Sequence, residues 1–301
     1  MCSLKDGYAA HSFFLGSGGD YVSADAVIIG APMDYTASFR PGTRLGPGII
    51  REMSAVLETY SPYLRGGLED ISLYDHGDLE LYLGNTKKSL DMIYQAAGEA
   101  FEDGKFPLFL GGEHLISLPV IKAAFEKYGS ELALFHFDAH TDLREEYMGE
   151  SLSHATVIKR CMDFMEGSSI YQFGIRSGLA EEFELGSRET NFYPFEVIGP
   201  LQRAVKEIGD RPLYVTLDID VVDPAYAPGT GTPEPGGCSA REILSAVHVF
   251  GACNLVGMDV VEVMGYGDPA GITGVLAAKI IREALIATAL GIKKGEWVNG
   301  T

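Results

Sequence analysis

Carboxylate and imidazole side chains follow three apolar runs of this chain. In DAHTD and DID they recur at every second position. Residues i and i+2 of an extended chain share a face, so each motif aims its side chains at one place. An unpaired carboxylate is too costly to desolvate inside a domain, so the group must be neutralised, by bound cations or by protons. The predicted metal ligands are His114, Asp138, His140, Asp142, Asp218 and Asp220.

Two divalent cations would balance these ligands. Two carboxylates about 4 Å apart repel by roughly 4 kcal/mol at an effective dielectric of about 20. The four carboxylates and one hydroxide carry five negative charges, against which two divalent cations supply four positive ones. Carboxylate oxygen and imidazole nitrogen without thiolate favour manganese over structural zinc, so we predict two Mn²⁺ per chain. Unrelated surface acids would explain one DxD motif, but not three motifs that converge.

The elements that must position these ligands follow the rhythm of an α/β fold, with short apolar runs between longer amphipathic ones. Because the runs are apolar on both faces, we predict a mostly parallel sheet in a three-layer α/β/α arrangement, with ligands bound at the carboxyl ends of its strands. Ser239 followed by Glu242 predicts a capped helix start. No linker divides the sequence, so residues 1–301 are predicted to form one domain. Strands are expected at 25–32, 106–112, 132–140, 170–176, 211–220 and 255–263, and helices at 115–129, 239–251 and 275–291.

Composition narrows the classes of partner. The formal charge of −19, from 42 acidic and 23 basic residues, gives no support for binding nucleic acid and suits a small cationic substrate. No signal-peptide pattern and no long apolar window occur, so we expect a cytoplasmic protein that does not span a membrane. The cysteines form no CxxC pair, which favours reduced thiols over a zinc knuckle or a disulfide framework; they are Cys2, Cys161, Cys238 and Cys253.

The motifs GGEH, HFDAHTDL and DIDVVDPAYAPGTGTPEPGG occur in the order and spacing of the ureohydrolases, the manganese family of arginase and agmatinase. The chain resembles this family over nearly its whole length, which implies an arginase/deacetylase-like fold. The deacetylases use a single zinc and a different ligand set, whereas an intact DxHxD argues for two metals. The resemblance implies that one manganese is held by His114, Asp138, Asp142 and Asp218, and the other by His140, Asp138, Asp218 and Asp220.

The resemblance also implies how such a site would act. A water between the cations would lose a proton near neutral pH and attack the guanidinium carbon of the substrate. Asp142 would accept a hydrogen bond from that hydroxide and pass a proton towards the departing amine. His154, in LSHAT, corresponds to the family's proton shuttle, and Glu262, in DVVEV, to the glutamate that pairs with the guanidinium.

Other residues near the motifs have less specific roles. Thr232, in GTGTPEPGG, corresponds to a threonine near the scissile group, so Glu262, Thr232 and His154 are the expected substrate contacts. A loop-shaping role for Thr232 and a surface position for His154 are the alternatives. Glu113 is expected just outside the metal ligands. The remaining histidines are expected to be structural: His11, His76, His136 and His248.

The motifs FDAHTDLR, LSHAT and GTGTPEPGG are most similar to bacterial agmatinases, which implies hydrolysis of agmatine to putrescine and urea. Arginases carry an asparagine two residues after DAHTD, where this chain has Arg144. Glu145 or Glu146 is the expected neighbour of the agmatine ammonium. The alternatives are guanidinobutyrase, guanidinopropionase, formiminoglutamase, an unusual arginase, or a catalytically silent paralogue that binds metal or polyamine. Family members assemble as trimers or hexamers, so a homo-oligomer is expected.

Overall fold

The computed structural model describes Leu4 and residues 12–294. Within this part of the chain, eight strands form one sheet in the order β4-β1-β5-β10-β9-β6-β7-β8. All neighbouring strands of this sheet pair in parallel, as predicted. The strands are β1 (Ala26–Ala31), β4 (Leu73–Asp78), β5 (Phe106–Gly111), β6 (Ala133–Phe137), β7 (Ile170–Phe173), β8 (Asn191–Tyr193), β9 (Leu213–Asp218) and β10 (Leu255–Val261).

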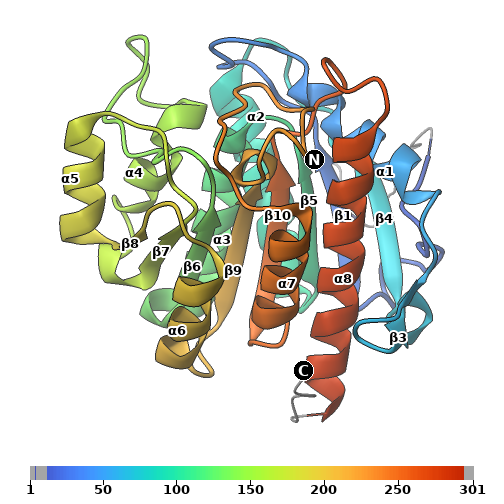
Figure 1. Ribbon diagram of the computed structural model, residues 1–301. Helices are drawn as coiled ribbons and strands as arrows, with labels where there is room; N and C mark the ends of the chain where they lie inside the picture. The colour runs from blue at the N-terminus through green and yellow to red at the C-terminus, as the bar shows by residue number, and fades with distance from the viewer. Residues whose placement is uncertain (1–3, 5–11, 295–301) are drawn as a thin grey trace.

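Helices cover both faces of the sheet (Figure 1), which confirms the three layers. In the view of Figure 1, α7 and α8 lie in front of the sheet, and α2 and α3 lie behind it. The α-helices are α1 (Gly46–Ser54), α2 (Thr86–Glu102), α3 (Ser117–Tyr128), α4 (Val157–Cys161), α5 (Ala180–Glu189), α6 (Ile198–Ile208), α7 (Ala240–Phe250) and α8 (Ile272–Lys294).

Short elements connect this framework. A two-stranded antiparallel hairpin consists of β2 (Tyr60–Ser61) and β3 (Gly66–Gly67). Single turns of 3-10 helix lie between the longer elements, and three of them begin next to predicted ligands or catalytic residues. These turns are η2 (Thr43–Leu45), η3 (Leu68–Asp70), η4 (His114–Ile116), η5 (Gly129–Glu131), η6 (His154–Thr156), η7 (Gly167–Ser169) and η8 (Ile219–Val221).

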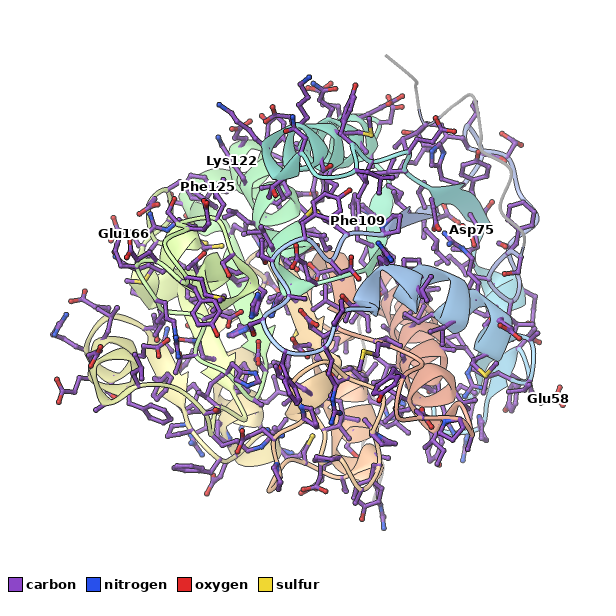
Figure 2. The ribbon with its side chains drawn as sticks, turned by 90° about the horizontal axis from the view of Figure 1, so that it is seen from above. Glu58, Asp75, Phe109, Lys122, Phe125 and Glu166 are labelled. Atoms are coloured by element: carbon purple, nitrogen blue, oxygen red, sulfur yellow. The ribbon has the colours of Figure 1, made fainter. Side chains whose placement is uncertain are left out.

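Alternation along the strands divides the core into two clusters. In β1, Ala26 and Ile28 pack with the cluster formed by α1, α6, α7 and α8, whereas Val27 and Ile29 pack with the cluster formed by α2, α3 and α4. Seen from above in Figure 2, Phe109 of β5 lies well inside the molecule, while the charged Lys122 and Glu166 lie at the rim. The sheet is therefore apolar on both faces, as the sequence pattern predicts.

Comparison with the predicted elements gives six correct strands and two that were not predicted, β4 and β8. β4 reads LYDHGD, whose polar residues give no apolar run, and β8 is a three-residue strand at the edge of the sheet. The predicted capping box of α7 is confirmed, because Glu242 N–H donates to Ser239 Oγ and Ser239 N–H donates to Glu242 Oε2. The predicted last helix, α8, packs against α1 and α7.

Other sequence predictions concern the whole chain. Among the described residues, no helix combines the length and the apolar character needed to cross a bilayer. Cys161, Cys238 and Cys253 are free thiols, whereas Cys2 and His11 lie outside the described residues. That residues 1–301 form one domain stays a prediction.

Candidate active site

The predicted ligand His114 faces three carboxylates at the carboxyl ends of the central strands. His114 begins η4 just after β5, and its Nδ1 lies 2.9 Å from Asp138 Oδ2. The same nitrogen lies 3.2 Å from Asp142 Oδ2 and 3.4 Å from Asp218 Oδ2. All four side chains are buried. The structure therefore brings together the residues predicted for one metal.

The second group lies beside the first. His140 Nδ1 is 3.0 Å from Asp220 Oδ2 and 3.4 Å from Asp138 Oδ1. The His140 side chain is 29% exposed, whereas Asp220 is buried. Asp138 thus takes part in both groups, which fits its predicted position between two ions.

The route by which these side chains converge differs from the predicted strand alternation. β6 ends at Phe137, so the whole DAHTD motif lies beyond the strand. His140 N–H turns back to donate to Asp138 Oδ1, and Asp142 has a φ of 50°. Asp220 lies in η8 rather than in β9, with its N–H donating to Asp218 Oδ1. Turns closed by the carboxylates themselves, not an extended chain, therefore position the ligands.

Atoms without partners test whether this group fits metal ions. His114 Nδ1, Asp142 Oδ2 and Asp220 Oδ2 are buried and form no hydrogen bond with any described residue. Buried polar atoms are rarely left in this way unless another species contacts them. Oxygen and imidazole donors that face one another across about 3 Å are the chemistry that divalent cations select. The residues present therefore fit a centre of two cations.

Protons would be needed to hold the group together if cations were not bound. Burial raises the pKa of Asp142 and of Asp218 well above the ordinary value. Burial lowers the pKa of His114 and of His140, but the neighbouring carboxylates outweigh it and raise both well above the ordinary value. Burial and neighbouring carboxylates together therefore favour protonated carboxyl groups and charged imidazoles when no cation is bound.

His136, predicted to be structural, lies within the same cluster of possible ligands as His114, Asp138 and Asp142. The amide Nε2 of Gln172 donates to His136 Nδ1 at 3.1 Å. The other ring nitrogen, Nε2, therefore carries the proton and donates it to Asp138 Oδ2 at 2.9 Å. Since both nitrogens of His136 are engaged, it acts as a support for Asp138, in keeping with the prediction.

Behind His114 lies a polar network that the sequence analysis missed. His114 Nε2 is 2.9 Å from Thr216 Oγ1, and that hydroxyl donates to Asp259 Oδ1 at 2.7 Å. Asp259 is fully buried and also accepts hydrogen bonds from Ser117 and Tyr214. Since the Thr216 proton is committed to Asp259, His114 must donate from Nε2. Its Nδ1 lone pair is thereby left for an ion.

A cavity of about 280 Å³ opens over the ligands and contains the predicted catalytic residues. Its lining includes His154, Glu262 and Thr232 beside the ligands. His154 Nε2 lies 3.3 Å from Ser38 Oγ at the mouth. Burial, followed by positive charge on His140 and His114, lowers the pKa of His154 to about 4, so the ring is neutral at pH 7.

Glu262 follows β10 in a left-handed conformation, with a φ of 63°. A residue other than glycine rarely adopts this conformation, and such strain is concentrated at functional sites. Its Oε1 accepts the His114 backbone N–H at 2.8 Å, and burial raises its pKa to about 8. Glu262 therefore presents a fixed carboxyl group to the cavity next to the metal ligands.

Glu145 and Glu146, which were predicted to lie beside the substrate tail, do not line the cavity. Glu145 is 70% exposed and pairs with Lys159 and Arg160. Arg144 and Glu182 line the cavity instead, with 3.5 Å between Arg144 Nε and Glu182 Oε2. Arg144 points into the cavity, whereas the side chain of Glu145 points to solvent. This part of the cavity wall therefore contains an ion pair, not a lone carboxylate.

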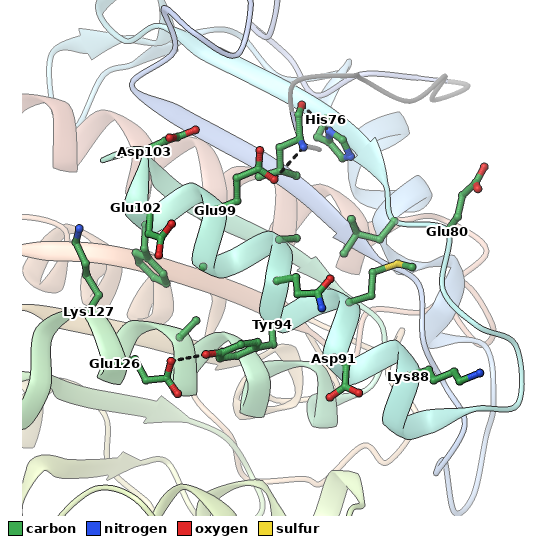
Figure 3. Close-up of a pocket in the computed structure, with 18 of the residues that line it drawn as sticks. His76, Glu80, Lys88, Asp91, Tyr94, Glu99, Glu102, Asp103, Glu126 and Lys127 are labelled. Atoms are coloured by element: carbon green, nitrogen blue, oxygen red, sulfur yellow. Dashed lines mark hydrogen bonds between the residues drawn. The ribbon is translucent and has the colours of Figure 1, made fainter. Parts of the chain in front are cut away.

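A larger groove of about 1380 Å³ lies elsewhere, along α2 and α3 (Figure 3). Its side chains include Tyr94, which donates a hydrogen bond to Glu126, and the acids Glu99 and Glu102. It contains none of the predicted ligands, and its lining comes mainly from α2 and α3, with His76 of β4 and residues that follow β4. The cavity over the predicted ligands is therefore the candidate active site, although the groove along α2 and α3 has the greater volume.

Comparisons with known proteins agree with this geometry. The model of the arginase family matches residues 24–287. The agmatinase of Bacillus subtilis (strain 168) is 48% identical over 276 residues, which are 91% of this chain and 95% of that protein. The mitochondrial guanidino acid hydrolase of Homo sapiens is 36% identical, over 87% of this chain and 78% of that protein. The solved structure of the agmatine ureohydrolase of Thermoplasma volcanium has a TM-score of 0.86 at 30% identity, covering 98% of this chain and 99% of that one.

Proposed function

This chain belongs to the arginase family, and on that premise we propose that it is a ureohydrolase that converts agmatine and water to putrescine and urea. The similarity to the agmatinase of Bacillus subtilis supports agmatine as the substrate. The observation that carries the proposal is one cavity that joins the His and Asp cluster to the carboxyl group of Glu262. A cytoplasmic homo-oligomer that serves polyamine synthesis stays a prediction.

Two Mn²⁺ ions are proposed for the centre. His114 with Asp142 would hold one ion and His140 with Asp220 the other, while Asp138 and Asp218 would contact both. Bound ions of this kind supply a hydroxide near neutral pH by lowering the pKa of a shared water. The buried atoms without partners support this assignment.

The chain's own residues would bind the substrate and move its protons. The Glu262 carboxyl group, held by the His114 N–H at Oε1, would pair as a carboxylate with the N–H donors of a planar guanidinium, whose positive charge favours the ionised form. Asp142 lies beside His114, with 3.2 Å between Asp142 Oδ2 and His114 Nδ1, and its carboxylate can hold the proton that the attacking water loses. His154, neutral at pH 7, can carry a proton to the departing amine, and Thr232 lines the same cavity.

A second candidate is hydrolysis of a guanidino acid, with a carboxylate at the far end of the substrate. Arg144 lines the cavity and is 31% exposed, so its guanidinium can meet such a tail. Its pairing with Glu182 and its position over the Tyr147 ring, at 4.7 Å, hold it in place. The human relative, a guanidino acid hydrolase, supports the same alternative.

A substrate panel tests the proposal. Urea release is measured after manganese loading, from agmatine, 4-guanidinobutyrate, 3-guanidinopropionate and arginine. We expect the highest kcat/KM with agmatine and about two manganese ions per chain by metal analysis. A preference for 4-guanidinobutyrate that Arg144→Gln abolishes would replace agmatine with the guanidino acid. No urea from any of the four compounds would favour the silent paralogue.

A further inference from the structure

His154 is held by a loop that is distant in sequence. Thr36, between β1 and η2, accepts the His154 backbone N–H through Oγ1 at 3.0 Å. The same oxygen lies 3.2 Å from His154 Nδ1. The other ring nitrogen, Nε2, faces the exposed Ser38 hydroxyl at 3.3 Å, on the side of the cavity. The two ring nitrogens therefore have different surroundings.

Glu113 fixes Thr36 from the opposite side. This side chain is 1% exposed, and its Oε1 accepts the Tyr35 N–H at 3.1 Å. Its Oε2 accepts the Thr36 N–H at 2.8 Å and lies 2.7 Å from Thr36 Oγ1. The Thr36 hydroxyl donates to the same Oε2 that accepts the Thr36 N–H, so Glu113 is the acceptor in this network.

The count of protons then decides the state of the histidine ring. A threonine hydroxyl has one proton, and that of Thr36 is committed to Glu113. Thr36 Oγ1 can therefore form a hydrogen bond with His154 Nδ1 only as the acceptor of an Nδ1–H donor. The Ser153 hydroxyl, at 3.4 Å, is more distant from the same nitrogen. Nδ1 therefore carries the proton, and Nε2 presents a lone pair towards the cavity.

We propose that Thr36, oriented by Glu113, is a positioning residue that fixes His154 with Nδ1 protonated and Nε2 free to exchange protons in the cavity. This inference rests on the proposed function, which assigns proton transfer to His154. In each turnover Nε2 takes up one proton and returns it to the departing amine, while Nδ1 keeps its own. A ring with the opposite tautomer would offer the cavity a proton instead of a lone pair.

Paired substitutions at Thr36 test the proposal. Thr36→Val keeps the side-chain shape but removes the hydroxyl, whereas Thr36→Ser keeps the hydroxyl. We expect Thr36→Val to lower kcat about tenfold or more, with KM and bound metal unchanged, because positioned acid–base groups contribute about 100-fold or more to rates. Thr36→Ser should stay within about threefold of the unaltered chain. The matched control is Thr288→Val, which should leave kcat unchanged, because the Thr288 hydroxyl donates to the Ala284 carbonyl in α8 and has no other hydrogen bond with the described residues.

A double variant shows whether Thr36 acts through His154. In the His154→Ala background, Thr36→Val should cause no further loss of kcat, since the group that Thr36 orients is gone. The proposal is overturned if the two losses multiply, if Thr36→Ser is as slow as Thr36→Val, or if Thr36→Val loses metal together with activity. These rates are measured with whichever guanidino compound proves to be the substrate.

A second readout does not depend on turnover. Long-range ¹H–¹⁵N spectra of the chain labelled in its histidine rings report which ring nitrogen carries the proton, and His154→Ala assigns the signal. We expect an Nδ1-protonated ring in the unaltered chain and a mixture of tautomers in Thr36→Val. An Nε2-protonated ring in the unaltered chain would overturn the inference even if agmatine is hydrolysed. Failure of the substrate panel alone would overturn only the proposed function.

Discussion

Two groups of buried charges in this protein differ in how they are neutralised. In one, Arg51 of α1 is 2% exposed and donates to Asp75 through Nε at 2.9 Å and to Asp78 through Nη1 at 2.5 Å. Asp75 also accepts the backbone N–H groups of Phe14 and Gly77. The carboxylates of this group therefore find their donors within the chain itself.

The other group, at the strand ends, has an excess of acceptors. Four carboxylates meet two histidines there, and His114 Nδ1, Asp142 Oδ2 and Asp220 Oδ2 have no hydrogen-bond partner among the described residues. The comparison indicates that the two groups of buried charges have different roles. A charge that the chain neutralises holds the fold together, whereas a charge left for an outside ion holds a site for chemistry.

The largest effect is expected where one residue serves the whole site. Asp138→Asn keeps the size of the side chain but removes a carboxylate shared by both groups of ligands. We expect kcat to fall by about 1,000-fold or more, out of the roughly million-fold or greater acceleration that enzymes provide. Metal analysis should show that most of the manganese is lost. Circular dichroism should still show a folded chain, and a fully loaded variant would contradict the shared role.

In the Arg51 group, one substitution should affect the fold instead. Arg51→Met leaves Asp75 buried without its cation, and breaking a buried ion pair in this way costs about 3–5 kcal/mol of the free energy of unfolding. Urea denaturation measures this loss. The control is Arg188→Met, at the exposed pair with Glu189, which should change stability by less than about 1 kcal/mol. Equal losses in both variants would remove the contrast between the groups.

The framework and the ligands could be predicted from the sequence because they repeat simple patterns. Apolar runs such as that of β6 identify parallel strands, and DAHTD places its ligands directly after one of them. β4 could not be found in this way. Its Asp75 and His76 are buried, and Asp75 is tolerated there because Arg51, 24 residues away, neutralises it.

The surroundings of the ligands could not be predicted either. Thr36 and Asp259 have no periodic signal, and their contacts with His154 and Thr216 exist only once distant segments pack together. The prediction of Glu145 or Glu146 beside the substrate tail gains no support from the cavity, which neither residue lines, for a related reason. Sequence proximity to DAHTD does not decide which way a loop residue points, and Glu145 pairs with Arg160 at the surface.

A substitution at the strand ends should have opposite effects with and without metal. Burial raises the pKa of Asp142, so the folded chain binds its proton more tightly than the unfolded chain does. Stability therefore falls as pH rises through the interval above the ordinary pKa of this carboxyl group. In chelator at pH 7, Asp142→Asn should raise the free energy of unfolding by on the order of 1 kcal/mol, a fraction of the roughly 4 kcal/mol repulsion of two close carboxylates.

Manganese should reverse that order. An ion at 100 times its dissociation constant stabilises the folded state by about 2.7 kcal/mol, and the variant should lose much of this gain. Thermal melts with chelator and with manganese measure both effects. A variant that is less stable than the unaltered chain in chelator would mean that Asp142 is a structural acid like Asp75.

The smallest effect concerns His154. This side chain is partly buried, but unlike the residues of the two groups of buried charges its ring stays neutral at pH 7. Its pKa is lowered from 6.5 to about 4, first by burial and then by positive charge on His140 and His114. Between these two pH values the unfolded chain binds a proton that the folded chain does not, so stability falls as pH falls from 6.5 to 4. The contribution of one such group is at most about 1.4 kcal/mol per pH unit within this window.

His154→Gln should remove this contribution and flatten the dependence by about 1 kcal/mol between pH 6 and pH 5. Urea midpoints of the chelated chain at pH 7, 6 and 5 measure it. His76→Gln is the matched comparison, because burial also lowers the pKa of His76, which lies in β4 at the edge of the sheet. If His76→Gln flattens the curve and His154→Gln does not, the His154 ring already accepts its proton in the folded chain. In that case bound metal ions, rather than burial, would have to keep the His154 ring neutral for proton transfer at Nε2.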